Sequence, residues 1–502
     1  MNRLFPIVGL MVLVALSTSG CMMLGPDYQT PTPPIQPDWI EVEDALIETT
    51  PPVTATWWHA AFRDPILDRL VATALAQNLS LRSAGLRVLQ ARQQLMIAIG
   101  NQYPQQQQLG GQAGIESFFS SSSDTLYDLG FNLSWEADVW GRFKRQIESA
   151  SAALDASVAN YDGIMVSLVA EVAQTYLLIR TTQQQLAVAR ANLGYQAESV
   201  RITTAKFEGG EVSALDVDQA QSLFYTTQAS VPGFEQSLQQ FKNTLAILLG
   251  QPPYAMNTLL VEPQPIPTVA RDVALGMPQD LIRRRPDIRV AERQLASQSA
   301  QIGFAITDLY PQFGISGAVG TSVSTADGLH FSDLFRSDTS GYNLFGVFQW
   351  NIFNYGRLKN NVRLQDAIFQ QLLEDYRQTV LQAQGEVENA IVAFLKSQEQ
   401  LDAFQSAADA AQRAVDISTL QYQDGLVNCN TVINTLRSLA AQQDQLAAAK
   451  GTVATNLIEV YKALGGGWEM REGKAPLDLI PEDTREEMLE RTDYWETTFK
   501  KE

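Results

Sequence analysis

One long helix is predicted over residues 142–207, which read RFKRQIESASAALDASVANYDGIMVSLVAEVAQTYLLIRTTQQQLAVARANLGYQAESVRITTAKF. Apolar residues recur in it every seven positions, at Val158, Met165, Val172, Ile179, Leu186, Leu193, Val200 and Phe207. A strict seven-residue period without proline is typical of a helix that winds against a neighbour as a coiled coil. At about 1.5 Å per residue this helix is about 99 Å long, which is longer than a globular domain needs. We therefore expect it to reach across a wide space.

The same pattern occurs twice along the chain. With an offset of 215 residues it returns as Leu373, Val380, Val387, Phe394, Leu401, Ala408, Val415 and Tyr422. The match runs without a gap from Trp135–Gly250 to Trp350–Gly465, whereas upstream the offset is 207. Chance similarity between two Ala/Gln-rich helices does not predict one fixed offset over so long a stretch. We infer a tandem duplication whose period is too long for a solenoid.

Composition excludes several classes of function. The chain has 502 residues and a net charge of −19, which argues against nucleic acid as a partner. After processing, the lone Cys429 leaves no intrachain disulfide, and the two isolated histidines, His59 and His330, predict no metal site. No Walker loop, nucleophile elbow or metal-ligand spacing is present, so no enzyme is predicted. Away from the N-terminus no apolar run reaches 18 residues, so no transmembrane helix is predicted.

Residues 1–20 are predicted to be a bacterial secretory leader. Arg3 precedes the apolar stretch Leu4–Leu16, and small residues fill positions 17–20. Gly20-Cys21 resembles a lipoprotein cleavage site, so Cys21 would carry a covalent diacylglycerol and an N-acyl lipid that tether the N-terminus to a membrane. Met22 after the cysteine resembles the signal for delivery to the outer membrane. The alternative is an ordinary signal peptide with an incidental cysteine.

A family resemblance rests on three motifs near the N-terminus. These are Cys-x-x-x-Gly-Pro-Asp-Tyr at 21–28, Trp57-Trp58 followed by Asp64-Pro65-x-Leu-Asp, and Asn78-Leu79-Ser80-Leu81. They resemble the outer-membrane efflux factor family, and within it the TolC-like lipoprotein channels of tripartite efflux pumps. Asp64 and Pro65 also suit the N-cap and first position of a short helix reaching about Gly100.

The predicted organisation follows from the repeats. A lipid-anchored linker covers 21–60, repeat 1 covers 61–250, a second linker covers 251–280, repeat 2 covers 281–465, and a C-terminal segment covers 466–502. Each repeat contains a short helix, a β-hairpin (103–139 and 310–354), a long helix (142–207 and 357–422) and a returning helix (213–249 and 428–464). Pro232 is expected to bend the first returning helix, and its counterpart Ala447 is not.

The hairpins show the alternation of strands with one apolar and one wet face. The clearest run is Tyr127, Leu129, Phe131, Leu133 and Trp135, which Tyr342–Trp350 repeats. A soluble hairpin and a membrane barrel both fit this pattern, and the leader, the lipid site and the flanking helices favour the barrel. Four strands cannot close a barrel and open edges are not tolerated in lipid, so at least two chains must share one.

The resemblance makes the fold more specific. It implies an α+β membrane protein, a homotrimer whose 12-stranded outer-membrane β-barrel is continued by an antiparallel coiled-coil α-helical barrel. Each long helix should end in a turn with a left-handed glycine, Gly210 or Gly425, and Ser213 or Asn428 should cap the returning helix.

A periplasmic gate is predicted near these turns. In the family a tyrosine near the second turn and acidic residues on the next helix tie the closed tip; Tyr422 matches the tyrosine, while the acidic positions are Thr431 and Asn434 here. Asp416 and Asp424 are candidate replacements, with Arg413 or Arg201 as partners. The alternative is that these four are ordinary solvated charges.

Two charged segments have simpler interpretations. Arg283-Arg284-Arg285 could form a phosphate-binding patch, but the run precedes Pro286-Asp287-Ile288 at a helix start and resembles a marker of the same family. The tail is acidic on balance and is expected to lie around the outside or to stay partly disordered.

The resemblance implies the function. It predicts the exit channel of a tripartite pump in the outer membrane of a Gram-negative bacterium, passively conducting drugs or other small toxic compounds. Its partners would be a periplasmic adaptor (membrane fusion protein), an inner-membrane pump of the resistance-nodulation-division class and outer-membrane lipid. Two alternatives are a channel exporting protein or polysaccharide and a structural coiled-coil lipoprotein without a pore.

Overall fold

The computed structural model describes residues 23–33, 35–41, 44, 47–48, 55–117, 123–256, 260, 262–269, 271, 273–274 and 284–499. The leader, Cys21 and Arg283 lie outside these residues. The chain forms two compact units: Met1–Thr32, Val88–Ser157 and Val290–Tyr376 make the first, and Pro33–Arg87, Val158–Arg289 and Arg377–Glu502 make the second. Each unit draws on both sequence repeats, because the strands of the repeats pair with each other and so do their helices.

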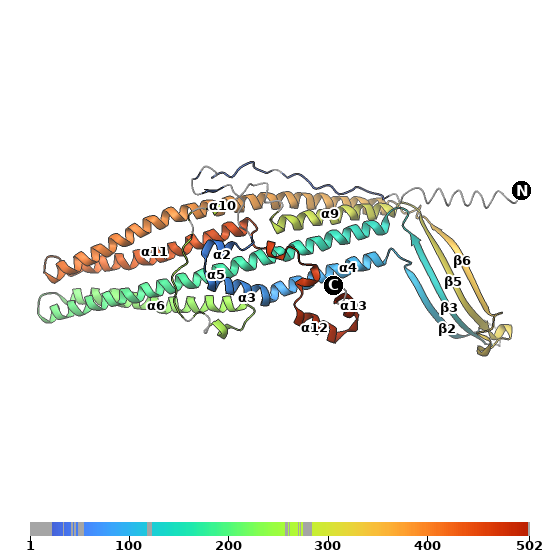
Figure 1. The fold of residues 1–502 in the computed structure, drawn as a ribbon, viewed down its shortest axis with the longest axis horizontal. Coiled ribbons are helices and arrows are strands. Elements are labelled where there is room, and N and C mark those ends of the chain that lie inside the picture. Colours follow the sequence, from blue (N-terminus) through green and yellow to red (C-terminus); the bar gives the residue numbers. More distant parts are fainter. Residues whose placement is uncertain are drawn as a thin grey trace. The chain divides into compact units, whose positions relative to one another are not determined.

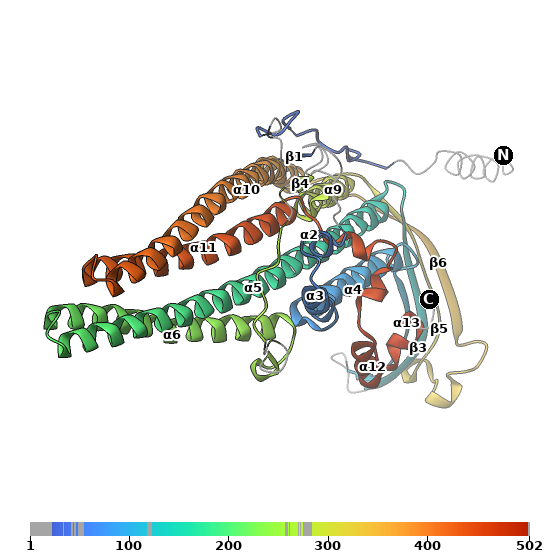
Figure 2. The ribbon, with the colours of Figure 1, turned by 60° about the vertical axis from the view of Figure 1, so that its left-hand side comes forward.

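Four long helices have bounds within one residue of the expected ones. They are α5 (Arg142–Glu208), α6 (Ala214–Leu248), α10 (Arg357–Gln423) and α11 (Cys429–Ala463). Figures 1 and 2 both show α6 lying along α5 and α11 lying along α10, as two antiparallel hairpins. Helix α6 continues through Pro232, and a bend there stays a prediction.

The short helix expected from Pro65 to Gly100 is two helices, which corrects the prediction. They are α3 (Pro65–Gln77) and α4 (Leu79–Gly100), and α2 (Trp57–Phe62) precedes them. Asn78 separates them with an extended backbone. Its side chain accepts a hydrogen bond from the Leu81 amide and donates one to the Leu248 carbonyl, at 2.9 Å each. A bond to a residue 170 positions away holds this break. In repeat 2, α9 (Pro286–Thr307) is uninterrupted.

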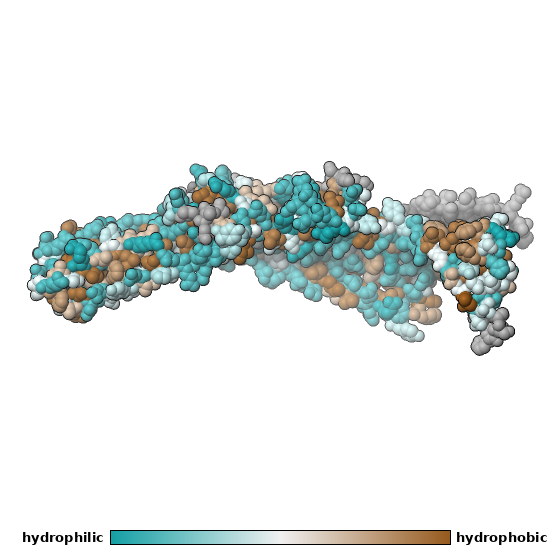
Figure 3. Space-filling model, turned by 90° about the horizontal axis from the view of Figure 1, so that it is seen from below, coloured by the Kyte–Doolittle hydropathy of each residue, from teal (hydrophilic) through white to brown (hydrophobic). Residues whose placement is uncertain are grey.

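The first unit contains one antiparallel sheet in the order β2-β3-β5-β6. Its strands are β2 (Gln106–Glu116), β3 (Asp124–Ala137), β5 (Gln312–Ser324) and β6 (Ser340–Gln349). Leu109 pairs with Phe131, Phe131 with Val319 and Val319 with Tyr342, so apolar residues of all four strands share one face. Figure 3 shows hydrophobic side chains gathered on the sheet. The outer strands β2 and β6 leave two edges.

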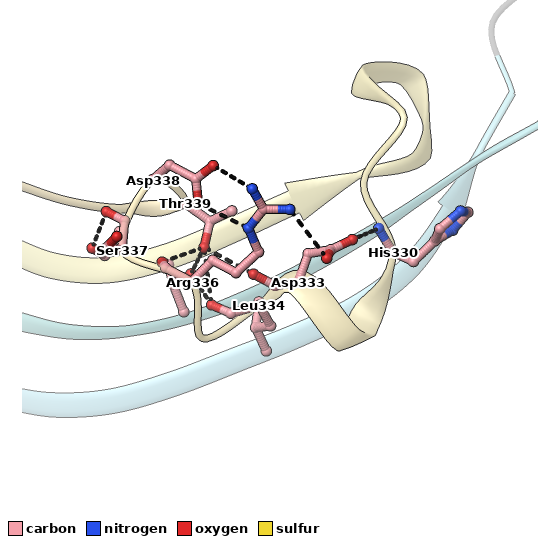
Figure 4. Close-up of polar contacts among 9 residues, drawn as sticks. His330, Asp333, Leu334, Arg336, Ser337, Asp338 and Thr339 are labelled. Atoms are coloured by element: carbon pink, nitrogen blue, oxygen red, sulfur yellow. Dashed lines mark hydrogen bonds and ion pairs between the residues drawn. The ribbon is translucent and has the colours of Figure 1, made fainter.

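The loop between β5 and β6 is folded rather than merely polar (Figure 4). It contains the 3₁₀ turns η2 (Thr325–Asp327) and η3 (Phe331–Asp333). The Thr339 hydroxyl lies 2.9 to 3.2 Å from the carbonyls of Asp333, Leu334 and Arg336. Arg336 donates to Asp338 through two nitrogens, and the His330 amide donates to Asp333. This network gives the hairpin end a defined shape.

The two returning helices, α6 and α11, differ in how many of their residues are buried. Fourteen residues of α11 are buried, against four of α6. Within α5 the heptad residues Met165, Val172 and Ile179 are buried, whereas Phe207 near its end is 45% exposed. One window of α5 is long and apolar enough to cross a membrane, which the search for unbroken apolar runs missed; 67% of that window is buried within the chain. Helix packing therefore accounts for its hydropathy.

Of the two expectations for the C-terminal segment, partial disorder does not hold for residues 466–499, which are folded through Phe499, and a position around the outside stays a prediction. The segment forms η4 (Glu469–Arg471), η5 (Pro476–Leu479), α12 (Glu482–Arg491), η6 (Asp493–Trp495) and α13 (Glu496–Phe499). It packs on α4, where a Cβ on Gly85 would lie 2.7 Å from the Leu479 carbonyl oxygen. Arg82 bonds Asp483 at 2.6 Å. The close approach of Leu479 to α4 thus holds the tail in place, and the exposed Arg82–Asp483 pair adds little.

Two linker segments also have partners. The two-residue strands β1 (Ile47–Glu48) and β4 (Val273–Ala274) pair in parallel. Arg285, the last residue of the arginine run, is buried and donates to the Ala463 carbonyl, Asp287 and Glu386. Burial of its guanidinium works against the charge, but Asp287 and Glu386 keep the pKa of Arg285 raised. Arg285 is committed to contacts within the chain, which favours a structural role over a phosphate-binding patch.

Candidate functional site

The two hairpin turns have the geometry that the sequence predicts. Gly210 and Gly425 adopt φ of +78° and +77°, where a Cβ is strained. Glu211 donates to the Lys206 carbonyl and Gly210 to the Phe207 carbonyl, the paired bonds of a Schellman motif. The Ser213 amide and hydroxyl both donate to the Asp216 carboxylate, at 3.0 and 2.7 Å, and Asn428 accepts from the Thr431 amide at 3.0 Å. These caps fix both turns.

Tyr422 lies at the end of α10 and is buried against the other hairpin. The Nζ atom of Lys206, on α5, lies 4.6 Å from the centre of the Tyr422 ring and 3.2 Å from the Tyr422 carbonyl oxygen. Burial raises the pKa of the Tyr422 phenol, and the neighbouring Cys429 thiol adds to the rise. Lys206 therefore joins the two hairpins next to their turns. Sequence reasoning missed it, although it directly precedes the last heptad residue, Phe207.

The four charged candidates do not pair with one another within one chain. Arg201 bonds Glu198, one turn earlier on the same helix, at 2.6 and 2.8 Å. Asp416 accepts from Gln412 on its own helix at 3.0 Å. Among the described residues, no ion pair joins Asp416 or Asp424 to Arg413 or Arg201. Residues three or four positions apart on a helix face each other, which explains the partners of Arg201 and Asp416. The pairing predicted for these residues is therefore not formed inside the described part of the chain.

An apolar cluster supports the Lys206–Tyr422 contact. It consists of Ala220, Leu223, Ala411, Val415, Tyr422, Cys429, Val432, Ile433, Leu436 and Leu439, with Val200, Ile202 and Val427 packed against it. All four long helices contribute to it. Cys429 is buried there, with its sulfur 3.5 Å from the Thr203 hydroxyl. The ends of the two hairpins are thus held together by one core.

Polar side chains also join α5 to α11. We call these bonds the polar seam, and its pairs are Gln174 with Glu459, Gln185 with Asp444, Asn192 with Gln443, and, within the apolar cluster itself, Thr203 with Cys429. Gln196 is buried in the same row, and neither of its amide atoms has a partner among the described residues. A groove of about 240 Å³ opens beside Gln185 and Asn192. A buried contact that is polar and incompletely bonded is weaker than an apolar one.

The seam is also close-packed at one point, which gives a prediction. A Cβ on Gly451 of α11 would overlap the Thr181 hydroxyl of α5. Gly451→Val should therefore push the hairpins apart and cost about 1–3 kcal/mol of stability, measured by thermal unfolding followed by circular dichroism. Gly385→Val on α10 is the matched control, because a Cβ there would meet no atom of another described element within 4 Å. Equal losses in both variants would contradict the close approach.

Comparisons with known proteins identify the family to which this architecture belongs. The family model described as outer membrane efflux protein matches residues 70–251 and 277–466. This chain belongs to that family. The two matched segments follow the two sequence repeats. The family consists of channel proteins of the Gram-negative outer membrane, not of enzymes.

Individual relatives agree with this membership. The toluene efflux pump outer membrane protein TtgF of Pseudomonas putida is 30% identical over 482 residues, which cover 92% of this chain and 97% of TtgF. The probable outer membrane lipoprotein SilC of Salmonella typhimurium is 28% identical over 464 residues, covering 91% and 98%. The solved outer-membrane channel OprN matches with a TM-score of 0.83 and 29% identity, over 89% of this chain and all of that chain. This outer membrane efflux protein and the known channels therefore share one fold, an α+β fold with long helices.

Proposed function

We propose that three copies of this outer membrane efflux protein pool their sheets into one 12-stranded barrel. The observation that carries the proposal is the four-stranded sheet, which has one apolar face and, within the described chain, two open edges. Lipid does not tolerate open edges, and the smallest membrane barrels have about eight strands. The long helices of the three copies would then form the periplasmic part of one duct.

The duct would be the exit of a tripartite pump. Cargo would come from an inner-membrane pump of the resistance-nodulation-division class through a periplasmic adaptor, and conduction would be passive. The TtgF relative, named for toluene efflux, supports small toxic compounds as the class of cargo. A long polar duct has little need to recognise its contents, so selectivity would reside in the pump.

We further propose that the helix turns form the gate. Lys206 would tie the α10–α11 hairpin to α5 in the closed state, and the polar seam is the contact along which the hairpins would separate. Asp416, within α10, and Asp424, directly after it, would act between copies, because both are exposed in a single chain. Charge reversal at either should then raise conductance in planar bilayers, and unchanged conductance in both variants would remove them from the gate.

Cys21 is proposed to carry the lipid. The SilC relative, itself named as a lipoprotein, supports this, and intact mass spectrometry of the mature protein tests it. An unmodified cysteine, or a mature N-terminus elsewhere, would contradict it.

Deletion of the gene tests the transport proposal. Susceptibility to a panel of drugs, solvents and metals should rise for at least one compound, and the wild-type gene should restore resistance. Pull-down should recover an adaptor, and the purified protein should admit solute in liposome swelling. No swelling would favour a pore-less coiled-coil lipoprotein, and swelling with a protein- or polysaccharide-export machine in the pull-down would favour the other alternative.

A further inference from the structure

Arg145, one turn into α5, is buried under the N-terminal segment. Its side chain is 0% exposed. Its Nε donates to the Leu24 carbonyl at 2.9 Å, and one terminal nitrogen donates to the Gly25 carbonyl at 3.1 Å and to Asp27 at 3.0 Å. The other terminal nitrogen donates to Glu148 at 2.7 Å. Three of these four bonds hold residues 24–27, which we call the N-terminal strap.

The strap fits against its receptor only because three positions lack a side chain. Gly25, at φ +89°, would overlap the Gly303 backbone if it carried a Cβ. A Cβ on Gly303 would lie 2.6 Å from the Arg145 Nε and 2.8 Å from the Leu24 carbonyl oxygen. A Cβ on Gly141 would lie 2.6 Å from the Met23 side chain. Such distances force a shift, so the strap occupies one defined position.

That position lies at the foot of the sheet. The Leu24 amide donates to the Trp140 carbonyl at 3.2 Å, three residues after β3 ends at Ala137. The Trp140 indole donates to the Pro311 carbonyl at 2.7 Å, directly before β5 begins. Met23 is thus fixed beside the ends of the two central strands.

Covalent geometry then limits where a lipid on Cys21 can be. Two residues span at most about 7 Å, so the Cys21 backbone stays within that distance of Met23. A lipid on a long flexible linker supplies membrane affinity alone. A lipid attached through so short a connection would also fix how deep the nearby ends of β3 and β5 lie in the bilayer.

We propose that Arg145 is a positioning residue for the acylated N-terminus, and that it places the lipid of Cys21 at the foot of β3 and β5 in the bilayer. The proposal rests on the proposed lipidation of Cys21. The lipid and the strap would therefore act together. The lipid can position the sheet only when the strap is bound to Arg145, and the strap positions the sheet best when the lipid holds it at the membrane.

A double-mutant cycle on full-length protein in outer membranes tests this unit. The four forms are the wild type, Arg145→Gln, a Cys21→Ser form with a non-lipoprotein leader, and their combination; the readout is the temperature at which the assembled species dissociates on semi-native gels. Each single change should lower that temperature, and the combination should lower it by much less than the sum, because interacting groups are not additive. Additive losses would overturn the proposal.

A matched control and a second variant keep the test decisive. Arg142→Gln also removes an arginine from the first turn of α5, but Arg142 contacts Asp308 and Phe304, so its loss should add to that of Cys21→Ser. If Arg145→Gln does not assemble, Gly303→Ala disturbs the same receptor with a single methyl group and should show the same coupling. Mass spectrometry of Cys21 accompanies every sample, and absence of a lipid in the wild type would overturn this proposal while drug export still tests the channel separately.

Discussion

Asp162→Asn should destabilise this protein by about 3 kcal/mol, the lower end of the cost of breaking a buried ion pair. Asp162, on α5, is fully buried and accepts hydrogen bonds from Arg471 and Arg289. Burial raises the pKa of its carboxyl group, and the two arginines offset part of the rise. The variant would leave two partly buried guanidinium groups, 13% and 27% exposed, without their carboxylate.

The position of Asp162 explains why its substitution should destabilise several elements at once. Arg471 belongs to the C-terminal segment, and Arg289, near the start of α9, also lies over the Trp468 ring at 4.6 Å. One carboxylate thus joins α5, α9 and the tail.

The measurement is thermal unfolding in detergent, with proteolysis of the tail as a second readout. Asp483→Asn is the matched control, because that exposed carboxylate also pairs with an arginine, Arg82, and exposed pairs contribute little. A variant of Asp162 as stable as this control would contradict a structural role for the buried cluster.

Lys206→Met should open the closed state. Methionine keeps the length of the side chain but removes the hydrogen bond to the Tyr422 carbonyl and the cation–π contact with the ring. Because Lys206 remains partly exposed, the two contacts together contribute about 1–2 kcal/mol, a shift of about five- to thirtyfold in the closed-to-open ratio per copy. Single-channel recording in planar bilayers should show higher conductance or longer openings.

Two controls separate this contact from general effects of charge. Arg201→Met removes a cation from the same helix end, but Arg201 bonds Glu198 in its own helix, so the gate should stay closed. Lys206→Arg keeps the charge over the ring and should preserve most of the closed state. Equal conductance in Lys206→Met and the wild type would remove Lys206 from the gate.

Periodic patterns made the long elements predictable. The heptads predicted α5, α6, α10 and α11 because a coiled coil repeats one local contact along its length, and the turn residues Gly210, Ser213, Gly425 and Asn428 predicted where the helices meet their turns. The alternation gave the strands because one face of the sheet is uniformly apolar. The constant offset between the repeats identified which helix and which strand of one repeat correspond to those of the other.

Contacts between residues distant in sequence were not predictable in this way. Asn78 breaks the first short helix through a bond to Leu248, and no local signal announces that partner. In the sequence, nothing distinguishes Arg145 from another arginine in a first helical turn. Its role comes from its bonds to the segment at 24–27, which is distant in sequence. The gate residues were predicted from their charge alone. In the structure Arg201 pairs with Glu198, three residues away on the same helix. The contact between the hairpins is instead made by Lys206 and the Tyr422 ring.

The stoichiometry of the purified protein tests the central proposal most directly. Native mass spectrometry of the detergent-solubilised protein should give three chains per particle, and heating should dissociate that particle together with its β signal in circular dichroism. A particle of one chain that keeps its strands in detergent would contradict the shared barrel.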